Sequence, residues 1–181
     1  MMGLALKNVG LTLYQDGKSI FQEQGEALFT HFGLSGPLVL SASAHLGDLA
    51  KHKYEVGFDL KPALSHEQLY ARLNRDLTAL ANRDAANCLV KLLPASMQPV
   101  MVERWGVDPA KKANQLTKEE RLALVELMKD FRIKIRERGD LEHAVITSGG
   151  VTVKEVDPRT MASKKCPGLY FAGEVLDVDA Y

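Results

Sequence analysis

The sequence lacks the features that mark membrane proteins and nucleic-acid-binding proteins. Lysine plus arginine and aspartate plus glutamate number 23 each, so the formal net charge is zero and no basic excess favours nucleic acid as a partner. No apolar run approaches the roughly 20 residues that a membrane-spanning helix needs, and the opening residues do not resemble a signal peptide. We therefore expect a cytoplasmic protein with no nucleic-acid or membrane partner.

Cysteine is also scarce, and neither of the two residues belongs to a C-x-x-C pair. Cys88 and Cys166 lie far apart, which favours two free thiols over a disulfide or a redox pair. The five histidines have no H-E-x-x-H context, so we expect no metal site. The G-x-G-x-x-G pattern that binds a dinucleotide at the start of a helix is absent as well.

What the sequence does contain is a change of hydrophobic period along the chain. Alternating apolar residues predict strands over 4–14, 18–21, 26–30 and 54–60. The phase slips near Asn8, which indicates a β-bulge, and Asp16-Gly17 is a strong hairpin turn. From residue 65 onward the period becomes helical, and we expect helices over 65–80, 85–93, 96–105 and 117–128.

Local end signals support these helices. Ser65-His66-Glu67-Gln68 and Thr117-Lys118-Glu119-Glu120 are capping-box patterns, and Gly106 is a good C-terminal stop. In the last predicted helix, we expect Leu122, Val125 and Met128 to share the buried side. Residues 131–136 then alternate as a strand with a cationic face, which is more often solvated than bound to a phosphate.

Together these patterns predict an α+β protein. We expect a small antiparallel β-sheet or open barrel over residues 1–62 and a helical bundle over 63–130. Return strands follow over 131–146, and a further β segment covers 147–181.

Two glycine-containing stretches are the candidate binding segments. In the first, Thr30-His31-Phe32-Gly33-Leu34-Ser35-Gly36-Pro37, two glycines and a proline imply tight turns. Ser35 could cap a helix over 37–46, whose first N–H groups could favour an anionic group. From the residues alone, ordinary capping that joins a strand to a helix is the favoured interpretation.

The second candidate segment lies near the end of the chain. The apolar run Leu169–Ala172 stops at Gly173-Glu174, which predicts a buried strand ending where the backbone passes close to a ligand. The acid can accept hydrogen bonds from sugar or ribityl hydroxyls, and the glycine leaves room for a phosphate or a ring. Residues 147–151 read Thr-Ser-Gly-Gly-Val, and 151–156 predict a short strand.

These segments, with Val175-Leu176-Asp177-Val178-Asp179, resemble the bacterial HI0933-like (YhiN-like, BaiN-like) flavoproteins, which are similar to FAD-dependent, NAD(P)-linked oxidoreductases. The resemblance implies FAD in the intact protein, with NAD(P)H as the candidate electron donor. It also implies that the cofactor neighbourhood includes Thr147, Gly149, Gly150, Gly173, Glu174, Asp177 and Asp179. Its implied flavin-facing loop contains Thr30, His31, Gly33, Ser35 and Gly36.

The sequence departs from the family pattern at both ends. The family's amino-terminal Rossmann unit is absent, and the chain stops at Tyr181, before a Gly-Gly-Tyr-Asn-like segment. We interpret the chain as a fragment, with an insert domain that covers the flavin and shapes the substrate pocket, followed over 147–181 by part of the FAD-binding domain. Its partners would then be the rest of its own flavoprotein chain and a small-molecule substrate.

The alternative is a protein-interaction or dimerisation module attached to a flavoprotein. A large exposed apolar patch on the helical region would favour that alternative.

Overall fold

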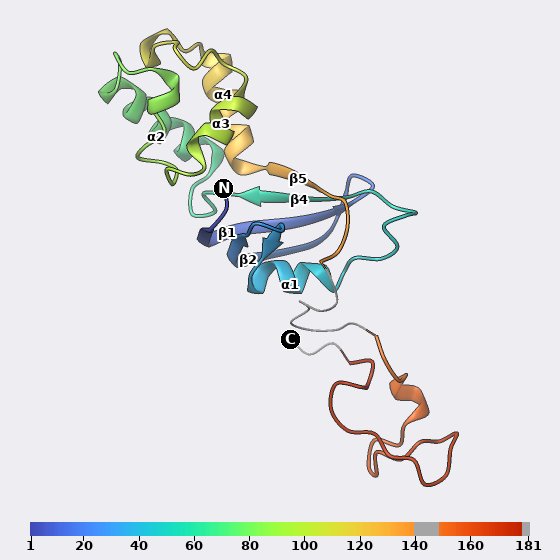
Figure 1. The fold of residues 1–181 in the computed structure, drawn as a ribbon. Coiled ribbons are helices and arrows are strands. Elements are labelled where there is room, and N and C mark those ends of the chain that lie inside the picture. Colours follow the sequence, from blue (N-terminus) through green and yellow to red (C-terminus); the bar gives the residue numbers. More distant parts are fainter. Residues whose placement is uncertain (140–148, 179–181) are drawn as a thin grey trace. The chain divides into compact units, whose positions relative to one another are not determined.

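The computed structural model describes residues 1–139 and 149–178, which fall into two compact units (Figure 1). The first unit is Met1–Glu137 and the second is Arg138–Tyr181. The expected α+β class is confirmed, because an antiparallel sheet and a group of helices make up the first unit. The domain boundaries predicted at residues 62, 130 and 146 stay predictions. No helix in the described residues combines the length and the apolar character needed to cross a bilayer.

The first unit contains a five-stranded antiparallel sheet that forms a half-barrel, with the strand order β3-β2-β1-β4-β5. Neighbouring strands in this order are hydrogen-bonded, and the short β3 and the late β5 form its two edges. The strands are β1 (Leu4–Gln15), β2 (Lys18–Phe29), β3 (Leu34–Ser35), β4 (Tyr54–Asp59) and β5 (Phe131–Ile135).

The hairpin of β1 and β2 follows the predicted turn and bulge. Asp16 and Gly17 both have positive φ, 51° and 82°, as a tight two-residue hairpin turn requires. The β1–β2 register shifts between Leu6 and Val9, so that an extra residue near Asn8 keeps the apolar side chains on the buried face. Both sequence predictions are confirmed here.

The separation of the predicted strands 18–21 and 26–30 is wrong, because β2 runs through Gln24-Gly25 without interruption. Gly25 pairs with Val9 in the ladder, and a Cβ on Gly25 would lie 3.7 Å from the side chain of Leu38. That distance is an ordinary van der Waals contact, so the helix packed on β2 does not itself require glycine at this position. Cross-strand pairing outweighs the local preference of glycine for a turn.

Helix α1 (Pro37–Ser43) begins at the predicted residue but has a different N-cap, and it ends three residues before 46. Its N-cap is Gly36 with φ 97°, and no side chain caps it. Ser35 instead pairs with Leu28 as part of β3, so the predicted cap by Ser35 is wrong. A Cβ on Gly36 would lie 3.2 Å from the backbone of β2, so only glycine fits this close approach.

Three further helices form the bundle beyond the sheet, namely α2 (His66–Ala79), α3 (Gln98–Trp105) and α4 (Lys118–Lys129). Both predicted capping boxes are present, at Ser65 and Thr117. Gly106 closes α3 in the left-handed conformation with φ 74°. Local sequence therefore sets most of the helix ends.

Two predictions for the bundle are wrong. Residues 85–93 contain only a 3₁₀ turn at Ala85–Asn87, since the Ala85 N–H donates to the Lys111 carbonyl at 2.8 Å and Asp84 bridges Lys112. Pairing with this distant segment replaces a local helix. In α4, Leu122 is 41% exposed, whereas its neighbour Leu124 is buried with Val125 and Met128.

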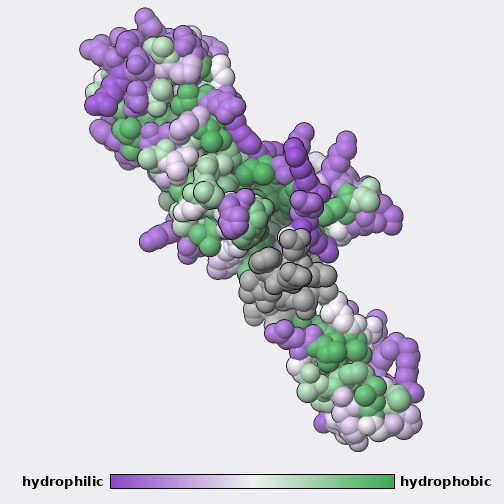
Figure 2. Space-filling model, viewed as in Figure 1, coloured by the Kyte–Doolittle hydropathy of each residue, from purple (hydrophilic) through white to green (hydrophobic). Residues whose placement is uncertain are grey.

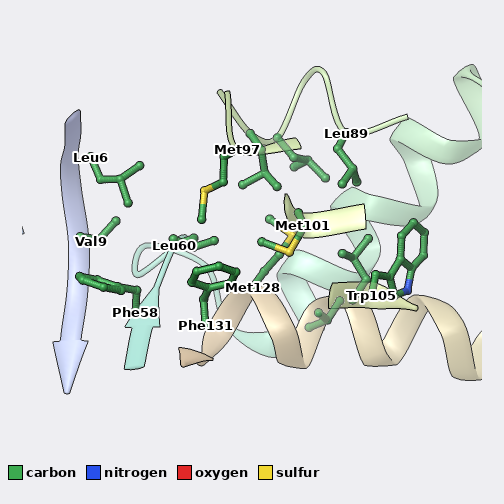
Figure 3. Packing of buried hydrophobic residues seen from close by; sticks show 14 of the residues in the cluster. Leu6, Val9, Phe58, Leu60, Leu89, Met97, Met101, Trp105, Met128 and Phe131 are labelled. Atoms are coloured by element: carbon green, nitrogen blue, oxygen red, sulfur yellow. The ribbon is translucent and has the colours of Figure 1, made fainter. Parts of the chain in front are cut away.

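Sheet and bundle share one hydrophobic core. Figure 3 shows apolar side chains running from Leu6 and Phe58 on the strands to Met101 in the bundle, with Leu60 and Phe131 between them. The Leu60 N–H also donates to the Met128 carbonyl at 2.9 Å. The two parts of the unit are therefore packed as a single body.

Lys129 fastens the same junction from the polar side. Its ammonium group lies 2.5 Å from a carboxylate oxygen of Asp59 and donates to the carbonyls of Lys61 and Leu64, at 3.2 and 2.8 Å. The Lys129 side chain is only 11% exposed. The end of α4 is thereby tied to the end of β4 and to the connection that leads into α2.

The second unit contains little regular structure in residues 149–178. It has a 3₁₀ turn at Val153–Glu155, and Val156 is its one buried hydrophobic residue among those described. The predicted strands over 151–156 and 169–172 are wrong. Tyr170 makes one isolated bridge, to Ala162, and is 65% exposed. Short apolar segments form strands only where a neighbouring strand completes the ladder.

Replacing Lys129 by methionine should lower the free energy of unfolding of the first unit by about 2 to 4 kcal/mol, because Asp59 and two carbonyls would lose their donor in a partly buried place. Urea unfolding followed by the fluorescence of Trp105 would measure this change. Lys51→Met is the matched control, since the ion pair of Lys51 with Asp48 is exposed and should contribute under about 1 kcal/mol. Equal effects of the two substitutions would contradict the role assigned to Lys129.

Candidate functional site

The two sequence motifs predicted for the cofactor lie against each other in the second unit. The Val151 N–H donates to the Val175 carbonyl at 2.8 Å, and the Asp177 N–H donates to the Val151 carbonyl at 2.9 Å. A Cβ on Gly150 would collide with the Val175 carbonyl oxygen, so glycine is required there. The segments 149–151 and 175–177 thus form one small parallel pairing.

Gly173 and Glu174 form an exposed turn just before this pairing. Gly173 has φ 79° and its Cβ position faces open space, while the carboxylates of Glu174 and Asp177 are exposed. Exposed carboxylates of this kind can accept hydrogen bonds from hydroxyl groups. Two other predicted site residues, Thr147 and Asp179, lie outside the described residues.

These groups fit one part of FAD and not another. Gly149, with φ 98° and open space at its Cβ position, leaves its backbone accessible beside the acceptors Glu174 and Asp177, which suits a chain of hydroxyls. Phosphates are commonly held at the N-terminus of a helix. Within residues 149–178 the described helical structure is a single 3₁₀ turn of three residues. The acceptors of residues 149–178 thus suit ribityl or ribose hydroxyls, and none of them lies at the start of a described helix that could hold the pyrophosphate.

The other predicted segment, Thr30–Gly36, follows β2 in the first unit and includes β3 and the N-cap of α1. The Thr30 N–H donates to the Gly33 carbonyl at 2.8 Å, and the Thr30 hydroxyl bonds both to that carbonyl and to the Gly33 N–H, at 3.0 and 3.1 Å. His31 and Phe32 are exposed at the tip of this turn. The turn therefore holds two ring side chains outward in a defined geometry.

A polar groove of about 500 Å³ lies between the outer face of the sheet and the bundle. The sequence reasoning did not identify this groove. Its floor comes from two rows of cross-strand neighbours, Gln24–Gly10–Asp59 and Gln22–Thr12–Gly57. Its wall comes from helix residues His66, Glu126, Lys129 and Asp130.

Arg132 contacts two residues that line this groove, Tyr14 and Asp130. Its guanidinium lies 3.8 Å from the centre of the Tyr14 ring and donates to Asp130 at 2.7 Å and to Glu55 at 3.3 Å. The Asp130 carboxylate raises the pKa of Arg132 above its usual value. The cationic strand face is therefore paired with two carboxylates at Arg132.

The sequence did hold one signal for the groove. Gly57 interrupts an otherwise apolar and β-prone strand, and a glycine inside a strand often marks a close approach. Here the Asp130 carboxylate and the Tyr14 ring occupy the space above Gly57. The polar positions of β1 and β2 were visible too, but Glu126, Lys129 and Asp130 of the wall lie more than 100 positions away from them in the sequence.

Fold and site together define a class of protein segment. It is a half-barrel whose β4 and β5 are separated in sequence by an inserted helical bundle, followed by a glycine- and acid-containing segment suited to the hydroxyls of a cofactor.

Comparison with known proteins identifies the family. A family model described as "HI0933-like protein barrel and H2TH domain" matches residues 1–146, so the chain belongs to the HI0933-like family. This family is one of FAD-dependent oxidoreductases, and the resemblance seen in the sequence is confirmed.

Three curated relatives match most or all of the chain. Ribosomal RNA dihydrouridine synthase of Escherichia coli is 32% identical over 183 residues, which is 100% of this chain and 42% of that protein. The Haemophilus influenzae protein of the same name is 31% identical over 165 residues, 91% of this chain and 38% of that protein. The 3-dehydro-bile acid delta(4,6)-reductase of Clostridium scindens is 28% identical over 169 residues, 90% and 41% respectively. The chain thus spans about two fifths of these relatives.

Replacing Gly57 by alanine should destabilise the first unit by about 1 to 3 kcal/mol, because the new methyl group would overlap the Asp130 carboxylate above it. Urea unfolding would measure the loss. Gly139→Ala is the control, since nothing lies within 4 Å of a Cβ at that position and its φ is not in the left-handed region. A Gly57→Ala protein as stable as the control would contradict the packing described for the groove floor.

The two cysteines should differ sharply in reactivity. Both are free, as expected from the sequence, but Cys88 is fully buried and Cys166 is exposed. Burial raises the pKa of the Cys88 thiol to about 11, so that almost none of the reactive thiolate exists near pH 8. Titration with a thiol reagent at pH 8 should modify one cysteine quickly in the folded chain and the second only after unfolding. Rapid modification of Cys88 in folded Cys166→Ser protein would contradict this.

Proposed function

We propose that the intact protein is an FAD-dependent reductase that saturates a carbon–carbon double bond in a conjugated ring, and that this chain contributes its substrate wall and part of its cofactor contacts. The names of two relatives support the reaction class. One protein is named for making dihydrouridine in ribosomal RNA, and the other for reducing positions 4 and 6 of a 3-dehydro bile acid. Both names describe the saturation of a double bond in a ring.

The electron balance of this reaction needs one hydride and one proton for each double bond. We propose that NAD(P)H passes a hydride to the bound FAD, that the reduced flavin would supply this hydride to the substrate, and that the proton would come from water. In the second unit, Glu174 and Asp177 would accept hydrogen bonds from the cofactor hydroxyls while Gly149 leaves its backbone open to them. In the first unit, the turn Thr30–Gly36 would face the ring system of the flavin. We further propose that the chain is a fragment whose partner is the rest of its own flavoprotein.

For the substrate, we favour a small neutral molecule over RNA. An RNA-binding surface is normally basic, whereas this chain has a formal net charge of zero. The groove of the first unit also carries four carboxylates against one lysine, and that lysine is already paired with Asp59. Neither feature would attract a phosphate backbone.

The interaction-module alternative finds less support. It expects a large exposed apolar patch on the helical region, but Val90 and Leu122 are the only large hydrophobic side chains of residues 63–130 that are exposed. Hydrophilic residues cover most of the bundle surface visible in Figure 2. We therefore keep the reductase proposal as the one that the chemistry of the described residues supports best.

The test compares the chain with a version extended to the full length of its relatives. The 181-residue chain should be colourless after purification and should retain no stoichiometric FAD, because it offers too few contacts for the phosphates. The extended protein should be yellow, and NAD(P)H should bleach its flavin absorbance without oxygen. Glu174→Gln in the extended protein should weaken FAD binding about tenfold, measured by flavin release on dilution.

The matched control is Glu137→Gln, an exposed carboxylate of the first unit that should leave FAD binding unchanged. An extended protein that binds no flavin, or whose flavin NAD(P)H does not reduce, would refute the proposal. Equal loss of FAD in both variants would refute the role of Glu174.

A further inference from the structure

Phe32 is the only phenylalanine, tyrosine or tryptophan of residues 1–137 that is mostly exposed, at 64%. Phe32 is not exposed because its turn is loosely held, since hydrogen bonds fix the conformation of that turn. Three hydrogen bonds join Thr30 and Gly33, and the adjacent Phe29 and Leu34 pair in the sheet. The chain therefore holds an apolar ring in solvent in a fixed position, which gains the isolated chain no burial.

The surroundings of Phe32 are also apolar or uncharged. The His31 ring lies at 82° to the Phe32 ring with 5.0 Å between their centroids, an edge contact that leaves ring surface open. Met2, 74% exposed, lies at the same end of the hairpin, since the Gly3 N–H donates to the Phe29 carbonyl at 2.8 Å. No residue of the turn Thr30–Gly36 is an acid, a lysine or an arginine.

We infer that Phe32 is the stacking platform for the conjugated ring that this protein reduces, with His31 setting the angle of that ring and Met2 extending the apolar surface. This inference rests on the proposed function. An exposed aromatic face with no formal charge near it in the turn suits a neutral planar ring and offers nothing to a phosphate. The shared chemistry of the candidate ligands is a ring double bond conjugated with a carbonyl group, found in a steroid enone and in a pyrimidine base.

Phe32→Trp in the 181-residue chain tests this directly and needs no flavin. The native Trp105 is buried, with its indole N–H donating to the Glu120 carbonyl at 2.7 Å, so an exposed indole introduced in place of Phe32 should add a separate, red-shifted emission. Leu122→Trp, on α4, is the matched control because Leu122 is also substantially exposed. The two probes are a 3-oxo-4-ene steroid and a uridine-containing oligonucleotide.

Saturable quenching of the introduced indole in Phe32→Trp and not in Leu122→Trp supports the inference, and the probe that causes it identifies the source of the ring. Quenching by neither probe, or equal quenching in both variants, overturns it. So does an indole in Phe32→Trp that acrylamide cannot reach in the absence of any probe, because protein would then cover the position. Quenching by FMN alone would mean that Phe32 contacts the cofactor, and this too overturns the assignment to substrate.

A second measurement uses the extended flavoprotein. Phe32→Ala should raise the KM for the ring substrate about five- to a hundredfold, the range expected for the loss of one stacked ring, while kcat falls less. Leu122→Ala should leave both constants unchanged. An unchanged KM in Phe32→Ala overturns the inference even if the flavin is bound and reduced. Failure of flavin reduction by NAD(P)H would instead count against the proposed function, so the two failures are distinguishable.

Discussion

The first unit depends on the packing of Leu60 and Phe131 where the sheet meets the bundle. These residues stand at the points where the chain leaves β4 for the helices and returns from the helices into β5. Both are buried, and their neighbours Phe58 and Met128 extend the same core into the sheet on one side and the bundle on the other. Because of this shared core, an insertion of about 70 residues between two paired strands acts as one body with the sheet. The groove exists for the same reason, since its floor and its wall lie on the two sides of the junction.

The glycines divide into two groups that sequence inspection cannot separate. At Gly36, Gly57 and Gly150 a Cβ would meet backbone or side-chain atoms, so these residues are explained by packing within the chain. At Gly33, Gly149 and Gly173, as at Gly3, Gly17, Gly106 and Gly168, the backbone has positive φ and nothing in the described residues lies within 4 Å of the Cβ position. Only the second group leaves backbone accessible to a ligand. Three of its seven members, Gly33, Gly149 and Gly173, lie in the segments predicted to be near the cofactor, and others, such as Gly17 and Gly106, simply form a turn or a helix end. The distinction depends on distant neighbours, such as Asp130 above Gly57, and thus appears only in three dimensions.

Much of the first unit could be predicted from local patterns. The bulge near Asn8, the Asp16-Gly17 turn and the two capping boxes each depend on residues within a few positions of one another, and all four are present. The errors arose where distant pairing decides the conformation. Pairing with Val9 keeps Gly25 within an extended strand, and the hydrogen bond from the Ala85 N–H to the Lys111 carbonyl replaces the local helix predicted at Ala85. The strand expected at 169–172 failed because an apolar run specifies burial only where another element supplies the partner. For the site, the sequence motifs predicted Gly149, Gly150 and Asp177, and the structure does bring these residues together. The groove could not be predicted in this way, because its residues come together only in the tertiary fold.

The two units also differ in how their structure is maintained. In the first unit more than thirty hydrophobic residues are buried in one cluster or packed against it, which fixes the groove and the turn at Phe32 before any ligand arrives. In residues 149–178 only Val156 is buried, and backbone hydrogen bonds such as Val151 to Val175 define the shape. A ligand that binds only the ordered form of this segment adds its binding free energy to a small intrinsic stability. A cofactor bound there should therefore affect the conformation of the second unit much more than that of the first, and the substrate wall that we propose for the first unit would be formed before binding, because that unit has the larger core.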